Sequence, residues 1–358
     1  MRKEPTASST TCRSTCRELL VVSPNWIGDA VMATPFLLTL RRCNPDAVIS
    51  VLCGDYVSEI FRRSSAVDRL VGVDRRRGLR EVYAALRRNR PDDGWEICFI
   101  LPRSFASALH GWLSGARRRI GYGGEMRSLL LTETLPGAGY RAEHLSTVFL
   151  RLLERADGQD SGEVPLPVVV PPYEWDGILT RLKLEGEYCV LAPGATYGSA
   201  KMWPVACFAD LAARLARRSR WRIVLVGTAG ERACAGQVIE RAGVDGVNMA
   251  GRLTMAELLS VVRGARLVVG NDSGPVHLAA AMARPTVAIF GSTSPDWTAP
   301  RGDAVRVVSH RIQCSPCFKQ ECPDGDPRCL VEIGVDEVFD AAVALIPASS
   351  AVYKEHGG

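Results

Sequence analysis

Lysine is scarce in this chain, because only five of its 44 basic residues are lysines and the rest are arginines. Arginine therefore serves as the default basic residue, and a cluster of arginines by itself is a weak sign of a binding site. A lysine within a glycine-rich loop is more informative in such a composition. Histidine is also rare, with five residues, and aromatic residues make up 7%.

Long apolar runs are missing as well, and no segment approaches the roughly 20 consecutive apolar residues needed to span a bilayer. Residues 1–17 are polar and rich in Ser and Thr, without the apolar region of a secretory signal. We therefore expect a disordered tail over 1–17 and a cytoplasmic location. The hydrophobic content of 47% and the charged content of 23% are typical of a globular protein.

The twelve cysteines do not form an obvious disulfide framework. Most of them lie within or beside apolar runs, as Cys53, Cys98 and Cys189 do, and free cysteine in such places behaves as a small hydrophobic residue. A large chain with scattered cysteines is typical of a reducing compartment.

The length of 358 residues favours two domains. Short apolar runs alternate with amphipathic stretches from residue 18 to 165, and again from 173 to 334. Examples are a helix predicted over Asp29–Arg42 and a strand predicted over Thr286–Phe290. This rhythm predicts α/β domains with parallel sheets covered on both faces. The proline-rich segment Val164–Pro172 predicts a linker between two Rossmann-like, doubly wound halves that face each other across a cleft. A last helix is expected over 335–350, with packing back toward the N-terminal domain as one option.

The first candidate site is Ser23–Asp29, which follows an apolar strand and opens a helix. It is not the G-x-G-x-x-G motif of dinucleotide-binding domains, which disfavours a nicotinamide enzyme. Asp29 stands where a strand-end loop meets a helix. Two interpretations stay open, a helix cap and a general base that removes a proton from an acceptor hydroxyl.

The second candidate site, Ala192–Pro204, is a loop of small residues that ends with Lys201. Backbone N–H groups in such a loop approach anions, and a lysine adds a point charge, although a simple turn has the same appearance.

The third candidate site, Val269–Ala280, passes from a strand into a helix. Asp272, Ser273, Gly274 and His277 lie where an anion would meet the helix N-terminus. A helix cap for Asp272 and a buried core histidine for His277 are the plainer alternatives.

Together these sites suit transfer of a group from a nucleotide diphosphate to a hydroxyl. The charge distribution favours an anionic partner, because the segment from Arg62 to Arg127 contains fifteen arginines and seven acids. A phosphorylated glycolipid, a membrane surface or a nucleic acid would suit that field. Nucleic acid is disfavoured, because aromatic residues that could stack on bases are not interleaved with the arginines.

Six segments taken together resemble the lipopolysaccharide heptosyltransferase II group of glycosyltransferase family 9. They are Pro24–Asp29, Leu101–Leu109, Gly121–Arg127, Pro193–Pro204, Asn271–Gly274 with His277, and Phe290–Pro295. The resemblance covers nearly the whole chain. It implies a GT-B fold, an acceptor bound by the N-terminal half, ADP-heptose bound by the C-terminal half, and inverting transfer that requires no cofactor or divalent metal.

The resemblance also implies residue roles. Asp29 matches the general base and Lys201 the lysine on the donor diphosphate, while Ser104 and Arg127 match residues near the acceptor. The remaining donor-binding positions implied are Thr196, Glu231, Asp272, Ser273, Gly274 and His277.

The implied reaction is transfer of L-glycero-D-manno-heptose to the heptose/Kdo inner core of lipopolysaccharide. The acceptor would be lipid A-Kdo-heptose, and the enzyme would be cytoplasmic and peripheral to the inner membrane. A heptosyltransferase I or III type, with another donor or acceptor, is the nearest alternative. A non-catalytic nucleotide-sugar binding protein is a further one, which the presence of both Asp29 and Lys201 disfavours.

Four cysteines near the C-terminal end are spaced differently from the others: Cys314, Cys317, Cys322 and Cys329. Thiolates at such spacing are ligands for zinc or an iron–sulfur cluster. A structural metal, disulfides and free thiols all remain open.

Overall fold

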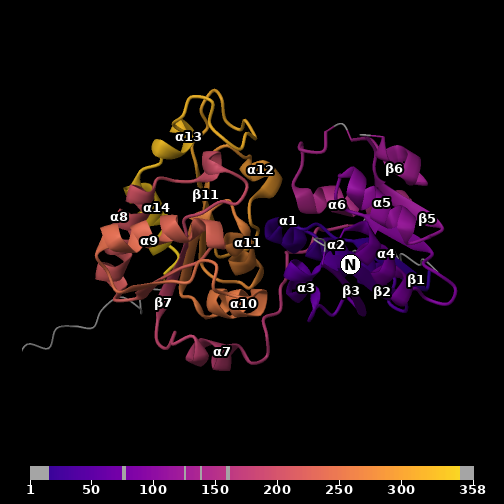
Figure 1. Cartoon of the computed structure of the whole chain (residues 1–358). Coiled ribbons are helices and arrows are strands. Elements are labelled where there is room, and N and C mark those ends of the chain that lie inside the picture. Colours follow the sequence, from indigo (N-terminus) through magenta and orange to yellow (C-terminus); the bar gives the residue numbers. More distant parts are fainter. Residues whose placement is uncertain (1–15, 75–77, 125, 138, 159–161, 347–358) are drawn as a thin grey trace, which may run out of the picture.

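The structure, a computed structural model, describes residues 16–74, 78–124, 126–137, 139–158 and 162–346. Of the predicted tail over 1–17, all but residues 16 and 17 lies outside the described residues. The described chain forms two α/β halves that stand side by side, each built on one six-stranded sheet (Figure 1). No helix within these ranges has the length and apolar content needed to cross a bilayer.

The N-terminal sheet has the order β3-β2-β1-β4-β5-β6, and all of its strand pairs are parallel. Its strands are β1 (Glu18–Val22), β2 (Val48–Gly54), β3 (Arg69–Val73), β4 (Ile97–Ile100), β5 (Arg118–Tyr122) and β6 (Glu133–Leu135). The helices of this half are α1 (Ile27–Met32), α2 (Thr34–Cys43), α3 (Asp55–Phe61), α4 (Leu79–Arg88), α5 (Phe105–Leu113), the 3-10 turn η2 (Arg127–Leu130) and α6 (Leu145–Asp157).

Both faces of this sheet are buried, as a parallel sheet requires. Successive residues of β1 point to opposite faces, so Leu19 joins one core and Leu20 another. The first core includes α1, α2, α3 and α6, and the second lies under α4 and α5. The sheet is therefore the middle layer of three.

The C-terminal sheet has the order β12-β11-β10-β7-β8-β9, again with parallel pairs. Its strands are β7 (Tyr188–Ala192), β8 (Arg222–Leu225), β9 (Gly246–Asn248), β10 (Leu267–Asn271), β11 (Thr286–Phe290) and β12 (Val305–Ser309). The longer helices are α7 (Trp175–Arg181), α8 (Val205–Ser219), α9 (Arg232–Ala242), α10 (Met255–Gly264), α11 (Gly274–Ala281) and α14 (Val335–Val343). The short ones are η3 (Ser199–Lys201), η4 (Ala229–Glu231), α12 (Pro295–Thr298) and α13 (Arg328–Val331).

Each half has the Rossmann strand order, with the first and fourth strands side by side at its centre. This confirms the predicted fold of two doubly wound domains. Ligands of such sheets bind at the carboxyl ends of those two central strands, where the connections run in opposite directions. In this chain that rule selects the loops after β1 and β4 in one half and after β7 and β10 in the other.

The predicted single helix over Asp29–Arg42 is wrong, because the helical chain is interrupted at Ala33 and forms α1 and α2. Pro35 lies in the first turn of α2, where its missing N–H costs nothing, but it could not continue a helix begun at Ile27. The interruption leaves α1 as a six-residue element that carries Asp29 toward the other half.

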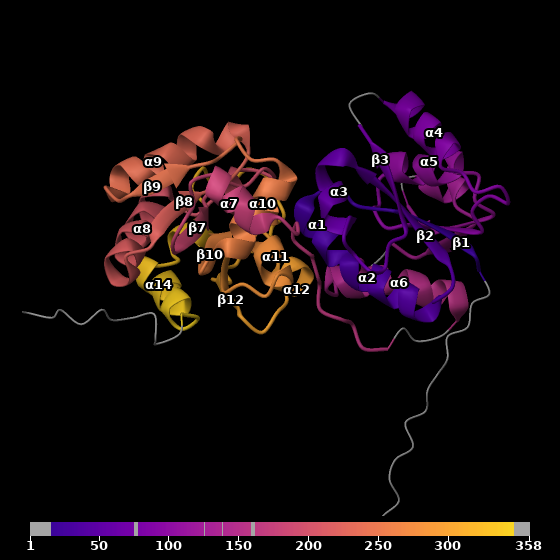
Figure 2. The same ribbon diagram turned by 90° about the horizontal axis from the view of Figure 1, so that it is seen from below.

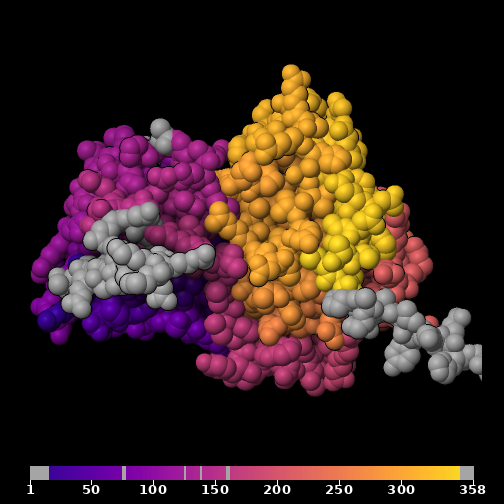
Figure 3. All heavy atoms as spheres, turned by 180° about the vertical axis from the view of Figure 1, so that it is seen from behind, coloured from indigo at the N-terminus to yellow at the C-terminus, as the bar shows by residue number. Residues whose placement is uncertain are grey.

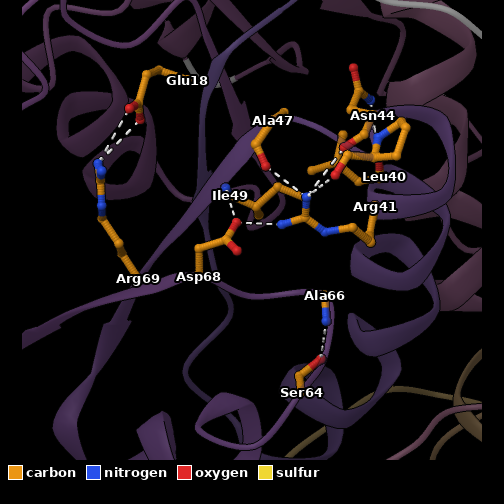
Figure 4. Close-up of polar contacts among 11 residues, drawn as sticks. Glu18, Leu40, Arg41, Asn44, Ala47, Ile49, Ser64, Ala66, Asp68 and Arg69 are labelled. Carbon is orange, nitrogen blue, oxygen red and sulfur yellow. Dashed lines mark hydrogen bonds and ion pairs between the residues drawn. The ribbon is translucent and has the colours of Figure 1, made fainter.

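A polar network lies at the end of the N-terminal sheet where β2 and β3 begin (Figure 4). Arg41 of α2 donates to the carbonyl oxygen of Ala47 at 2.7 Å and forms an ion pair with Asp68. The Asp68 carboxylate also accepts from the Ile49 N–H at 2.7 Å. These contacts connect α2, β2 and the segment before β3, and so hold the scaffold that carries α1.

The C-terminal helix does not return to the N-terminal domain. α14 packs against α8, β11 and β12 of its own half, and its residues Val338 and Ala342 are buried in that core. Figure 2 shows α14 on the side away from the N-terminal half. The last four residues of the predicted helix, 347–350, lie outside the described residues.

The proline-rich segment runs between the halves without regular structure. The Val168 N–H donates to Thr34 Oγ1 at 3.0 Å, and the next N–H, of Val169, donates to the Ala281 carbonyl at 3.2 Å. Thr34 belongs to the N-terminal half and Ala281 to the C-terminal half. Both halves are thus connected to adjacent residues of the linker.

The halves touch directly where α1 crosses α11, and the space-filling view shows them in contact (Figure 3). Two glycines permit this approach. A Cβ on Gly28 would lie 2.9 Å from Cδ2 of His277, and one on Gly274 would lie 2.7 Å from Cβ of Ile27. Larger side chains at these positions would force the halves apart.

Candidate active site

A cavity of about 370 Å³ lies between the two halves, and residues from both line it. It lies at the carboxyl ends of β1, β7 and β10, so the structure brings all three motif loops together. The lining includes most of the predicted site residues, namely Asp29, Thr196, Lys201, Glu231, Asp272, Ser273, Gly274 and His277.

Asp29 enters the cavity from the first turn of α1. Burial between the halves raises the pKa of Asp29 to about 6. The charge of His277 opposes that shift, the charge of Asp272 adds to it, and Lys201 opposes it. Asp29 is the only one of these four from the N-terminal half. A carboxyl group with such a pKa is suited to proton transfer near neutral pH.

Lys201, at the end of η3, is anchored by Asp272. Its Nζ lies 2.5 Å from Oδ2 of Asp272, which also accepts from Thr293 Oγ1 at 2.7 Å. The other oxygen, Oδ1, lies 3.4 Å from Nε2 of His277. Burial alone would raise the pKa of Asp272, but the charges of Lys201 and His277 and their hydrogen bonds hold it well below its usual range. Asp272 therefore stays ionised and fixes the position of the lysine.

The N-terminus of α11 lines the cavity, with Ser273 as its N-cap residue, and because Pro275 has no N–H the first helical donors there are those of Gly274 and Val276. The Ser273 hydroxyl does not cap the helix. Among the described residues, three buried donors of the cavity lining have no hydrogen-bond partner: Ser273 Oγ, Trp297 Nε1 and Thr298 Oγ1. Buried polar groups are nearly always paired, so a polar ligand in the cavity would satisfy them.

Glu231 lies in a slot between two glycines. A Cβ on Gly194 would lie 2.3 Å from its Cδ, and one on Gly227 would lie 2.7 Å from its Oε2. Its Oε2 accepts from the Thr228 N–H at 2.6 Å, and Thr196 Oγ1 donates to its Oε1 at 3.4 Å. The carboxylate is therefore fixed at the edge of the cavity, where it can accept hydrogen bonds from hydroxyl groups.

The structure does not bring Ser104 or Arg127 into the cavity. Ser104 is the N-cap of α5 and accepts from the Ser107 N–H at 3.2 Å. Arg127 is 1% exposed and donates to the Pro102 carbonyl oxygen at 2.8 Å. Both side chains have structural roles at the carboxyl end of β4, near the cavity but not in its wall.

Sequence reasoning missed four aromatic or cationic side chains of the cavity, namely Tyr56, Arg141, Trp297 and Phe318. Arg141 comes from a loop of the N-terminal half and stacks on two rings of the other half, at 4.9 Å from the Trp297 centroid and 4.3 Å from that of Phe318. Its neighbour Tyr140 contacts Arg103 in the same way, at 4.6 Å.

The segment with the four clustered cysteines supports the Lys201 loop. The Ala200 N–H donates to the Gln320 carbonyl oxygen at 3.0 Å, and Tyr197 Oη donates to that of Phe318 at 2.7 Å. All four thiols, of Cys314, Cys317, Cys322 and Cys329, are free in the structure. Across the described ranges, no three His, Cys, Asp or Glu side chains are arranged as metal ligands. The structural metal stays a prediction.

The comparisons with known proteins agree with this geometry. A profile of glycosyltransferase family 9 (heptosyltransferase) matches residues 82–326. Lipopolysaccharide heptosyltransferase 2 of Escherichia coli K12 is 26% identical over 343 residues, 92% of this chain and 98% of that protein. Its Salmonella typhimurium counterpart is 27% identical over 355 residues, with the same coverage.

A solved structure gives the same result. The Escherichia coli ADP-heptose LPS heptosyltransferase II superimposes with a TM-score of 0.77 at 25% identity, over 92% of this chain and 98% of that chain. The predicted GT-B architecture is thereby confirmed. The chain belongs to glycosyltransferase family 9.

Proposed function

We propose that this glycosyltransferase transfers heptose from ADP-heptose to the inner core of lipopolysaccharide, with inversion at the anomeric carbon. The observation that carries the proposal is the shared cavity. It combines Asp29 from the N-terminal half with Lys201 and the α11 N-terminus from the C-terminal half. The named relatives, which are heptosyltransferases of type 2, support this choice of donor and acceptor.

The C-terminal wall would hold the donor. Lys201 supplies a fixed positive charge, and the Ser273 hydroxyl and the α11 N–H groups supply hydrogen-bond donors for the diphosphate. Glu231 would accept hydrogen bonds from the ribose hydroxyls. In this arrangement the positive charge that offsets the departing ADP comes from the protein, and transfer requires no divalent metal.

The reaction would proceed in one displacement. The acceptor hydroxyl oxygen forms a bond to the anomeric carbon as the bond from that carbon to the diphosphate breaks. Asp29, as the carboxylate, accepts the hydroxyl proton, and ADP leaves with the bonding electron pair. Lys201 and the α11 amides stabilise the negative charge that develops on the leaving group.

The acceptor would enter from the N-terminal side. Arg141 is the cationic residue of that half in the cavity lining, and Arg103 lines a shallower hollow beside Gly124 and Gly137. These two arginines are suited to the phosphates and carboxylates of a lipid A-Kdo-heptose acceptor, and the predicted acceptor residues Ser104 and Arg127 lie outside the cavity wall. The enzyme would act in the cytoplasm, peripheral to the inner membrane.

The test is ADP release from ADP-heptose in the presence of a core acceptor that lacks the outer heptose. We expect Asp29→Asn to lower kcat by at least about a hundredfold, because the base is removed, while the affinity for ADP changes little. Asp176→Asn is the matched control, since Asp176 is an exposed acid in the first turn of α7. A kcat near that of the unaltered enzyme in Asp29→Asn would remove Asp29 from the mechanism.

Two further arms separate the alternatives. Acceptors that carry Kdo alone, or a completed heptose pair, distinguish the type I and type III reactions from the type proposed. A chain that binds ADP-heptose but releases no ADP with any of the three acceptors would be a binding protein, and the proposed transfer would be abandoned.

A further inference from the structure

Helix α5 is unusual for a surface helix, because it contains no Asp, Glu, Lys or Arg. Its sequence is apolar nearly all round, which is typical of a helix buried on every side. Yet Phe105 is 48% exposed and Trp112 is 51% exposed. These residues are seven apart, about two turns, so they point from the same side of the helix, with half-buried Leu109 between them.

The neighbouring elements extend this apolar surface. Turn η2, which packs against α5, exposes Leu129 by 81%, and Met126, directly before this turn, is 75% exposed. Met126 has a φ of 58°, a conformation that L-residues rarely adopt. On the other side of α5, helix α4 exposes Leu79 and Tyr83, four residues apart on one face.

We call these six residues the apolar face, and they are Leu79, Tyr83, Phe105, Trp112, Met126 and Leu129. They are nearly half of the thirteen large hydrophobic residues that the described chain exposes, and they come from three adjoining elements. Exposed apolar side chains gathered on adjoining elements mark an interaction site, unlike single apolar residues scattered over a surface.

The charges beside the apolar face are positive. Exposed arginines of α4 lie on its border, at positions 80, 87 and 88, and Arg87 stacks over Tyr83 at 6.0 Å. The acid of these three elements is Glu81, which forms an ion pair with Arg88 at 3.3 Å. Aromatic and aliphatic side chains bordered by arginines are the combination that binds the headgroup region of an anionic bilayer.

We propose that the apolar face docks this enzyme on anionic membranes. Trp112, Met126 and Leu129 would insert among the headgroups, and the arginines of α4 would contact lipid phosphates. This docking role rests on the proposed function, because an acceptor that carries lipid A is anchored in such a membrane.

The position of the apolar face agrees with this role. Phe105 directly follows Ser104, the residue that begins α5 just beyond the carboxyl end of β4. That end of the sheet is the side on which the cavity lies. The Phe105 end of the apolar face therefore lies at the cavity end of the N-terminal sheet, from which a membrane-anchored acceptor would approach Asp29.

The experiment is co-sedimentation of the full chain with vesicles of phosphatidylethanolamine and phosphatidylglycerol. We expect binding that weakens at high salt and is lost on phosphatidylcholine vesicles. Trp112→Glu with Leu129→Glu should weaken binding at least about tenfold, because two inserted apolar side chains are replaced by anions. Leu129→Glu alone is the milder variant, since this most exposed side chain contributes little to folding.

The matched control is Tyr173→Glu with Val331→Glu, which alters exposed apolar residues elsewhere on the surface. This pair should bind vesicles like the unaltered chain. Equal vesicle binding by the Trp112–Leu129 variant and the unaltered chain, or no binding by either, overturns the proposal. So does a dimer in solution that the variant dissociates, because the apolar face would then bind a second copy.

Activity separates this inference from the proposed function. With a soluble core oligosaccharide lacking acyl chains, the Trp112–Leu129 variant should turn over like the unaltered enzyme. With the acceptor embedded in vesicles its rate should fall. If both enzymes bind vesicles but neither releases ADP, the docking surface stands and the transfer reaction does not.

Discussion

The two halves share one strand order but place different chemistry at equivalent points. In the N-terminal half the loop after the first strand, β1, leads to an acid, Asp29. In the C-terminal half the loop after the corresponding strand, β7, leads to Lys201, and the loop after β10 leads to the α11 N-terminus. The scaffold therefore determines where chemistry occurs, and the loop residues determine which charge stands there.

The outer surfaces differ as well. In the N-terminal half, α4, α5 and the η2 segment expose six large apolar residues within 79–129, whereas in the C-terminal half the large exposed apolar residues are three from separate segments, Tyr173, Val307 and Val331. The half that would receive a lipid-anchored acceptor thus carries the apolar face. The half that would bind a water-soluble nucleotide sugar does not.

The largest effect expected from this division is on donor binding. Lys201→Met should weaken ADP binding by about tenfold to a hundredfold, since a charged hydrogen bond is worth about 1.5–3 kcal/mol. Asp29→Asn should leave ADP binding nearly unchanged and lower kcat instead. Isothermal titration with ADP measures the first, and steady-state kinetics measure the second.

Lys183→Met is the control for Lys201→Met, because Lys183 is exposed and distant from the cavity. A loss of ADP affinity in Asp29→Asn as large as that in Lys201→Met would contradict the division of roles between the halves.

The next effect is on the pH profile. Burial raises the pKa of Asp29 to about 6, and the base must be ionised to accept a proton. We therefore expect kcat/KM to fall about tenfold for each pH unit below 6 and to level off above it. Because the charge of His277 lowers the pKa of Asp29, His277→Gln should move this limb to higher pH.

Initial rates between pH 4.5 and 8 measure this limb. A limb near pH 4, the range of an ordinary exposed carboxyl, would show that Asp29 is not the titrating base. A limb at 6 that stays in place in His277→Gln would show that the titrating group is not the Asp29 carboxyl beside His277.

The smallest effect is expected from metal removal. In the proposed mechanism Lys201 and the α11 amides supply the positive charge at the diphosphate, so turnover with and without a chelator should agree within about twofold. Elemental analysis for zinc and iron tests the clustered cysteines separately. Loss of turnover on chelation, restored by magnesium, would contradict transfer without a metal.

Much of the fold could be predicted from sequence, because buried strands are continuous apolar runs. The interval Thr286–Phe290 was predicted with the bounds that β11 has. Helix α5 was missed because Phe105–Leu113 lacks the polar positions that reveal a helical period. The break between α1 and α2 was missed although Pro35 signalled it.

The site was predictable where one loop carries a whole motif, as at Lys201 and at Ser273. Arg127 was placed near the acceptor, but its guanidinium is buried and donates to a carbonyl of its own half. Tyr56, Arg141 and Trp297 were missed, because they meet at the cavity only after the two halves come together. Sequence spacing contains no signal for such a meeting.

The linker amides define how the cavity would open. Consecutive N–H groups, of Val168 and Val169, are bonded to different halves, so a rotation that separates the halves must pivot near that peptide. The prolines on both sides of it resist bending elsewhere. Where α1 meets α11, Gly28 and Gly274 have no side chains that could hold the two helices together. Departure of ADP by such a rotation would therefore turn the chain near Val168 and part the apolar residues that the two halves share in one core.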